Sequence, residues 1–244
     1  MTGVPQSLEA AVEQAKVATR AAIEAGVPRI IVDLNIPELK ALPIAQQFYP
    51  LLEELGLKFK VYFPDAGAAA LARRDWQEPD FSIRGINEAK GRLEADDEAC
   101  LIVEPSSVEV NDVEEFCNAA TGQYVVMLNP KLEDIATIGI GYAGRQLRER
   151  FLSTLESCYY LQPLEGATLL RIYPGPWQVW GETEDDTYEL LGEFPSKPSG
   201  EAIANLFADT DPEAEDGSAG TSINRPKKSG IFAELGQFIR ALTQ

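Results

Sequence analysis

Polar side chains that could bind a ligand or take part in catalysis follow several predicted strands directly. These strand-end residues are Asn35, Asp65, Glu104 and Asn129. Parallel strands bring their carboxyl ends to one edge of a sheet, which is where open α/β sheets bind ligands. Carboxylate and amide oxygens at such an edge could hold a hard cation such as Mg²⁺. The same side chains could instead cap the helices that follow them, so we assign no metal and no cofactor to the chain.

Two arginine pairs offer a way to bind a carboxylate or a phosphate. Arg145 and Arg148 lie three residues apart and share one face of a predicted helix, and Arg73 and Arg74 precede Trp76. A guanidinium group can hold such an anion through two parallel hydrogen bonds. The alternative is a solvent-exposed helix face on which neighbouring acids pair with the arginines. These four residues are therefore candidates for an anion or partner contact.

The stretch VYFPDAGAAALARRDW, residues 61–76, is typical of a strand that turns into a helix at a glycine. A phosphate-binding loop usually has several glycines and often a lysine. This turn has Gly67, no lysine, and Asp65 at the position that the anion would occupy. We therefore predict that the Asp65 carboxylate caps the helix by accepting its free N–H groups.

A second glycine motif, GIGYAG at residues 139–144, matches the G-x-G-x-x-G pattern of dinucleotide-binding folds. That pattern normally follows a strand directly and opens a helix. Here it follows KLEDIAT, which itself resembles a helix, and no later acidic residue stands where a ribose partner would be. The motif is interpreted as a hinge between two helices.

Composition excludes several classes of function. Asp and Glu outnumber Lys and Arg by 39 to 21, which gives a formal charge of -18 and argues against nucleic acid as a partner. The chain contains no histidine, so Ser-His-Asp and Cys-His catalysis are excluded. An enzyme built on this chain would depend on a carboxylate base or on a metal. A binding protein with protein or small-molecule partners is favoured.

The cysteines and the N-terminal segment indicate the cellular compartment in which the protein is located. Cys100, Cys117 and Cys158 are scattered without CxxC spacing, and buried free thiols in a reducing compartment fit them best. The N-terminal segment lacks the basic start and the apolar core of a signal peptide, and no apolar run approaches the ~18 residues of a membrane span. We expect a cytoplasmic protein.

The elements that must position these residues alternate between strands and helices. A helix is predicted over residues 8–25, with Ser7 as its cap and Gly26 as its end. The apolar run at residues 29–34 predicts a strand that is covered on both faces. Up to Asn129 the alternation, which includes a helix across residues 44–55, predicts a Rossmann-like, mostly parallel sheet with flanking helices. A further helix is predicted around residues 145–156. Short aromatic-rich runs then predict an antiparallel strand meander, whose first strand could extend the sheet or form a second layer.

Three segments are predicted along the chain. Residues 1–208 form a single α/β domain with the meander at its end, residues 209–229 form an acidic disordered linker, and residues 230–244 form an amphipathic helix. The apolar face of this helix consists of Ile231, Phe232, Leu235, Phe238, Ile239 and Leu242. It could dock on its own domain, on a partner or at a membrane interface, where nearby basic residues would help.

Three stretches carry a resemblance to a known family. The stretch at 61–76, RQLRERFLSTLESCYYLQPL at 145–164 and LLRIYPGPWQVW at 169–180 resemble a cyanobacterial and plastid domain family, number nineteen-ninety-five in the unknown-function series. The resemblance covers roughly residues 7–194. The family includes plastid proteins similar to low photosystem II accumulation factors, and in some plant proteins the domain is joined to an adenylate kinase-like domain.

The resemblance implies two functions and supplies no catalytic residues. The first is a non-enzymatic role in photosystem II assembly, with assembly intermediates as protein partners. Peripheral contact with the thylakoid membrane through the C-terminal helix is expected from the apolar spacing of that helix alone, because the helix lies outside the resemblance. The second is a nucleotide- or phosphometabolite-handling enzyme that uses the strand-end residues. The absence of histidine and of an intact phosphate motif favours the first.

Overall fold

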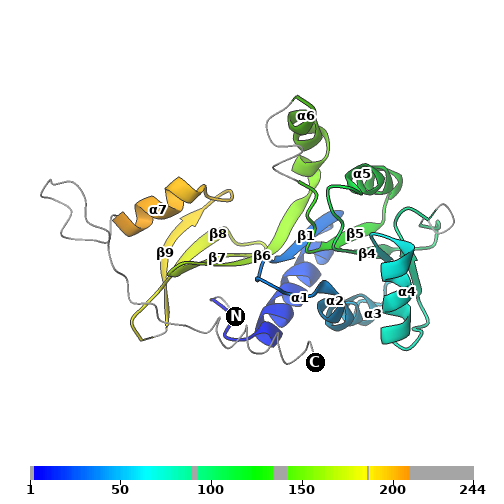
Figure 1. The fold of residues 1–244 in the computed structure, drawn as a ribbon, viewed down its shortest axis with the longest axis horizontal. Coiled ribbons are helices and arrows are strands. Elements are labelled where there is room, and N and C mark those ends of the chain that lie inside the picture. The colour runs from blue at the N-terminus through cyan, green and yellow to red at the C-terminus, as the bar shows by residue number, and fades with distance from the viewer. Residues whose placement is uncertain (1–2, 89–92, 134–141, 186, 209–244) are drawn as a thin grey trace, which may run out of the picture.

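The computed structural model describes residues 3–88, 93–133, 142–185 and 187–208, which form a nine-stranded sheet flanked by helices (Figure 1). The strand order is β3-β2-β4-β5-β1-β6-β7-β8-β9. The strands are β1 (Arg29–Leu34), β2 (Phe59–Phe63), β3 (Ser82–Gly85), β4 (Ala99–Val103), β5 (Tyr124–Leu128), β6 (Glu156–Leu164), β7 (Ala167–Ile172), β8 (Trp177–Glu182) and β9 (Tyr188–Phe194). The predicted fold class, a mostly parallel α/β sheet followed by an antiparallel meander, is confirmed.

Strand β6 joins the two halves of the sheet. It pairs in parallel with β1 and antiparallel with β7, so the first strand of the meander extends the main sheet instead of starting a second layer. Four consecutive residues of β6, Cys158 to Leu161, are buried, as is typical of a strand that is covered on both faces. The sequence alone had left this placement open.

Seven α-helices and one 3₁₀ turn accompany the strands within the described residues. They are α1 (Leu8–Glu24), α2 (Ala41–Phe48), α3 (Pro50–Glu54), α4 (Ala66–Asp75), α5 (Val110–Ala119), α6 (Tyr142–Arg150), η1 (Leu152–Thr154) and α7 (Gly200–Ala208). The first helix begins as predicted, because the Ser7 side chain accepts a hydrogen bond from the Ala10 N–H at 3.1 Å. It also ends as predicted, before Gly26 with a φ of 77°.

The helices cover the two faces of the sheet unequally (Figure 1). The larger core packs α1, α2, α3 and α4 against one face of the parallel strands. On the opposite face, α5 and α6 enclose a second core that includes Phe116 and Leu147. The third core lies at the antiparallel end, where α7 packs Ile203, Leu206 and Phe207 against β7 and β8.

Strand β1 differs from its prediction. Ile30, Val32 and Leu34 are buried, whereas Ile31 and Asp33 are only partly covered. The expectation that both faces of this strand are covered was therefore wrong. The physical reason is a cavity on the face of β1 opposite α1, described below.

The helix boundaries also differ in three places. The helix predicted across residues 44–55 is split at Tyr49 and Pro50 into α2 and α3. The helix predicted around residues 145–156 ends at Arg150, and a 3₁₀ turn follows. Helix α7 was not predicted, although Ser199 accepts a hydrogen bond from the Ala202 N–H at 3.2 Å and is a readable capping signal.

Several predicted features lie outside the described residues. They are the linker at 209–229, the amphipathic helix at 230–244, and the part of the GIGYAG motif that precedes Tyr142. Among the residues that the structure describes, no helix combines the length and the apolar character needed to cross a membrane.

Candidate functional site

A cavity of about 750 Å³ lies at the carboxyl ends of the central parallel strands. The loop after β1 leads to the helices on one face of the sheet, whereas the chain after β5 leads to α6 on the other face. Neighbouring strands whose connections leave toward opposite faces open a crevice between them, and such crevices are the usual ligand sites of open α/β sheets. The cavity is lined by Ile31, Asp33, Leu34, Asn35, Ile36, Pro37, Glu38, Leu39, Glu104, Asn129, Pro130, Lys131, Leu132, Glu133, Leu152, Leu155, Tyr160 and Lys197.

Three of the four predicted strand-end residues line this cavity together. Each donates its backbone N–H to the next strand in the sheet: Glu104 to Leu128 O, Asn129 to Val32 O and Asn35 to Leu161 O, all at 2.8 Å. The residues at the ends of β4, β5 and β1 therefore follow one another along the edge in spatial order. Sequence separation hid this order, because β1 comes first in the chain and lies between β5 and β6.

Two of these residues have an unusual backbone conformation. Glu104 and Asn129 both have a φ of 49°, in the left-handed region. Asparagine tolerates this region, whereas glutamate enters it at a cost of roughly 1–3 kcal/mol. The Asn129 side chain helps to fix its position, because its Oδ1 accepts a hydrogen bond from the Leu34 N–H at 2.8 Å. The loops after β4 and β5 are also joined by the Lys131 N–H, which donates to Pro105 O at 2.7 Å.

Asp33 is the acidic group of β1 that faces the cavity. Burial raises its pKa from 3.8 to about 6, and the attraction of Lys197 opposes part of this rise. No donor among the described residues makes a hydrogen bond to its carboxylate. The Asp33 side chain is only partly covered, so a ligand in the cavity that supplied a donor would make the hydrogen bond that the described residues do not make.

The Tyr160 hydroxyl lies at the centre of a network of polar side chains, on the side of the cavity that β6 forms. Its hydroxyl oxygen accepts hydrogen bonds from Lys197 Nζ at 2.7 Å and from Asn35 Nδ2 at 3.3 Å, and the hydroxyl donates to Gln162 Oε1 at 2.6 Å. The Lys197 ammonium also lies 4.0 Å from the centre of the Tyr160 ring and 5.8 Å from that of Trp177. These contacts hold the segment between β9 and α7 over the cavity.

The fourth strand-end residue, Asp65, lies away from the cavity and caps α4. Its Oδ1 accepts a hydrogen bond from the Ala68 N–H at 2.9 Å, which confirms the predicted capping. The corner is also closed by β3, because a Cβ atom on Gly85 would lie 2.7 Å from Ala66 N and from Asp65 C. Strand β3 therefore approaches the start of α4 closely.

The candidate arginines do not gather at one site. Arg73 donates to Ile83 O at 2.7 Å and so ties α4 to β3. Arg74 pairs with Asp75 at 2.7 Å. Arg148 holds the cavity residue Glu133 through two hydrogen bonds of 2.7 and 3.3 Å, while Arg145 is exposed and does not line the cavity.

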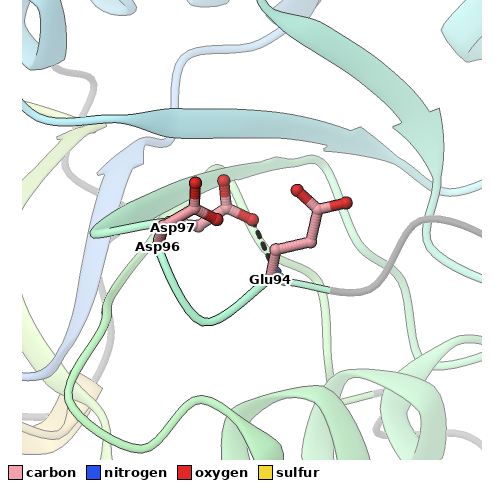
Figure 2. Close-up of side chains that lie close together, drawn as sticks. All are labelled: Glu94, Asp96 and Asp97. Atoms are coloured by element: carbon pink, nitrogen blue, oxygen red, sulfur yellow. Dashed lines mark hydrogen bonds between the residues drawn. The ribbon is translucent and has the colours of Figure 1, made fainter.

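An acidic cluster lies at the turn that leads into β4, at the opposite end of the strands. It consists of Glu94, Asp96 and Asp97, whose carboxylate oxygens lie within 4.8 Å of one another (Figure 2). Lys60 Nζ lies 2.7 Å from Asp97 Oδ2, and Lys58 pairs with Asp96. The Glu94 N–H donates to Asp97 Oδ2 at 2.6 Å, the dashed line of Figure 2. Two lysines thus already balance much of the charge, and we interpret the cluster as an ion-pair network.

Sequence reasoning missed Asp33, Tyr160 and Lys197 as site residues. Asp33 carried a readable signal, since it is the one acidic residue in the apolar run RIIVDL. Tyr160 had a weaker signal, because it lies within the apolar run CYYLQPL, where an aromatic residue is expected in the core. Lys197 had none, because only the return of the chain after β9 brings it to β6.

The family comparison agrees with the resemblance noted in the sequence. The family model described as "Domain of unknown function (DUF1995)" matches residues 5–205. This chain belongs to that family. The match extends from the start of α1 into α7 and so includes every strand of the sheet and all residues that line the cavity. The family description assigns no chemistry to these residues.

Proposed function

We propose that this member of the DUF1995 family is a binding protein that takes a small polar molecule in the cavity at the carboxyl ends of β1 and β5. The observation that carries the proposal is the cavity itself, with the Asp33 carboxyl group in its wall. Its volume of about 750 Å³ lies within the range of small-molecule sites, roughly 300–1,000 Å³. Its lining combines ten apolar or aromatic residues with eight polar or charged ones, which suits a ligand that is itself polar.

Binding is favoured over catalysis because the positioned polar groups already have structural partners. The Asn129 side chain joins two strands, and the Tyr160 hydroxyl makes three hydrogen bonds. The chain has no histidine to act as a base. A binding site requires only that such groups be held in place.

The second candidate is the enzyme that handles a nucleotide or phosphometabolite at the same edge. The observation in its favour is Asp33, because a pKa of about 6 suits a general acid or base near neutral pH. The charge of the lining weighs against it. Glu38, Glu104 and Glu133 join Asp33 there, against Lys131 and Lys197, and this excess of acids repels phosphate.

Thermal-shift measurements with a metabolite panel test the binding function. The panel contains amines, amino acids, sugars and nucleotides, the last with and without Mg²⁺. We expect at least one compound to stabilise the protein by several degrees and to lose this effect in Ile31→Trp, which fills the cavity. Val17→Trp is the matched control, because Val17 is 65% exposed on α1, and it should respond like the wild type. If no compound stabilises the wild type more than it stabilises Ile31→Trp, the proposed binding function is wrong.

We further propose that the protein acts in a cyanobacterium or a plastid, in photosystem II assembly through protein contacts near the thylakoid membrane. The support is the sequence resemblance over residues 7–194. In a deletion strain of a cyanobacterium that encodes the protein, photosystem II abundance should fall, and complementation with the full gene should restore it. Normal abundance in the deletion strain would count against this role.

Membrane or partner contact through the C-terminal segment is a separate part of that proposal. The apolar spacing of residues 231–242 supports it. A variant that lacks residues 221–244 should lose sedimentation with thylakoid-lipid vesicles or with the protein partner. Equal association of the variant and the full chain would rule out this docking role.

A further inference from the structure

The Asp33 carboxylate is the cavity group that most lacks a partner of its own. It receives no hydrogen bond from the described residues, and Lys197, the cation that attracts it, donates to the Tyr160 hydroxyl instead. No ion pair within 4.0 Å joins Asp33 to a lysine or arginine of the described chain. The fold therefore holds one partly covered acid in the cavity wall and supplies no hydrogen bond to it from the described residues.

Apart from Lys197, which donates to the neutral Tyr160 hydroxyl, the other charged groups around the cavity are paired or acidic. Lys131 Nζ lies 3.3 Å from Glu104 Oε1, and Arg148 holds Glu133 at 2.7 Å. Glu38 adds a further carboxylate to the lining. Because the cations are already engaged and acids predominate, the open positions of the cavity favour a positively charged group.

The remaining lining is apolar and continuous with the second core. Leu152 and Leu155 pack against that core and also line the cavity, and Leu132 is buried beside them. Ile36 and Leu39 add apolar surface from the loop after β1. A ligand with a hydrocarbon portion would bury it against these side chains.

We propose that the cavity binds a small organic amine or guanidine, whose protonated nitrogen pairs with the Asp33 carboxylate and whose hydrocarbon part packs against Leu132, Leu152 and Leu155. This inference rests on the proposed binding function and names its ligand class. A charge-assisted hydrogen bond to the ligand supplies the partner that Asp33 lacks.

Binding should depend on pH through Asp33. The groups that share the cavity with it are Lys197, Tyr160, Glu38, Glu104, Lys131 and Glu133. The amine pairs with the ionised carboxylate, so protonation of Asp33 competes with binding. The Asp33 pKa of about 6 places this competition below pH 6. Affinity should fall about tenfold for each pH unit below that value.

Isothermal titration calorimetry of the full chain with three matched probes tests the inference. The probes are phenethylamine, 2-phenylethanol and 3-phenylpropionate, which share a phenyl group and differ in charge. At pH 7.5 we expect phenethylamine to bind at least tenfold more tightly than the alcohol, and the acid to bind least. This preference should disappear in Asp33→Asn, which keeps the shape of the side chain. It should persist in Asp112→Asn, an exposed position on α5.

The outcomes separate this inference from the binding function. If the probes bind in a manner sensitive to Ile31→Trp but phenethylamine has no advantage, the amine assignment is overturned and the binding function stands. An advantage that survives Asp33→Asn, or that does not weaken between pH 7.5 and pH 5, also overturns it. If none of the probes or panel compounds responds to Ile31→Trp, both proposals fail.

Discussion

Asp33 and Tyr160 lie opposite each other in the parallel register of β1 and β6. They are 127 positions apart in the sequence (160 minus 33), yet both line the same cavity. Lys197 joins them, because it donates to the Tyr160 hydroxyl and attracts the Asp33 carboxylate. This arrangement places an ionisable acid, a phenol and an ammonium at the edge where the parallel strands end.

Replacing Asp33 should change how stability depends on pH. Its pKa is about 6 in the folded protein and near 3.8 when exposed, so the folded state binds its proton more tightly. The contribution of Asp33 to stability therefore falls as pH rises from about 4 to 6 and stays low above that range. Asp33→Asn should raise the free energy of unfolding at pH 8 by up to about 3 kcal/mol, with little gain at pH 4. Urea denaturation of the wild type and of Asp33→Asn at both pH values measures these free energies. The prediction is contradicted if the difference between the two proteins is the same at pH 4 and pH 8.

Of the residues in the acidic cluster at the start of β4, we expect Asp97 to contribute most to stability. The Asp97 side chain is fully buried and lies 2.7 Å from Lys60 Nζ, so Asp97→Ala removes the nearest counter-charge of a largely buried lysine. We expect a loss of about 3 kcal/mol in urea denaturation. Asp96→Ala is the matched control and should change little, because the Asp96 side chain is 70% exposed. Stabilisation by Mg²⁺ that disappears in Asp97→Ala would instead reveal a metal site.

A methyl group on Gly85 should disturb the corner that Asp65 closes. The added Cβ would lie 2.7 Å from two backbone atoms, and backbone cannot move aside as a flexible side chain can. Gly85→Ala should therefore cost about 1–3 kcal/mol of stability in the same denaturation assay. Gly200→Ala provides the comparison, because a Cβ there meets nothing within 4 Å. Equal stability of the two variants would show that β3 does not approach α4 this closely.

The three cysteines should react slowly with thiol reagents in the folded protein. All three are free and buried, and burial raises the pKa of Cys117 and of Cys158 from 9.0 to about 12. At pH 8 the reactive thiolate fraction of each is thus roughly a thousandfold below that of an exposed thiol. Labelling with Ellman's reagent should be slow in buffer and complete at once in denaturant. Rapid labelling of one thiol in buffer would identify a site that opens to solvent.

Local sequence signals predicted the individual elements well. The cap at Ser7, the stop at Gly26 and the apolar run of β1 each act within a few residues, so the sequence predicted their bounds closely. The Asp65 cap belongs to the same class, since its carboxylate binds an N–H only three residues away. The missed helix α7 carried such a signal in Ser199 but follows a stretch rich in proline and serine, which resembles a loop.

Long-range packing decided the candidate site. The sequence indicated that Asn35, Glu104 and Asn129 lie at strand ends, but the same reasoning predicted that Asp65 lies beside them. The strand order places β2 on the far side of β4 from β5, so Asp65 cannot reach the cavity. The arginine candidates were also separated, since Arg73 binds a carbonyl of β3, Arg148 pairs with Glu133 and Arg74 pairs with its neighbour Asp75.

The sequence by itself determined the alternation of strands and helices, the acidic surface and the absence of histidine chemistry, because these depend on composition and on contacts between residues close in the chain. Only the tertiary structure decided that β6 lies beside β1, that one face of β1 opens onto a cavity, and that Lys197 reaches Tyr160. These features depend on which strands pair and on how the chain returns to the sheet. Burial of the whole sheet sets that pairing, and no local stretch encodes it.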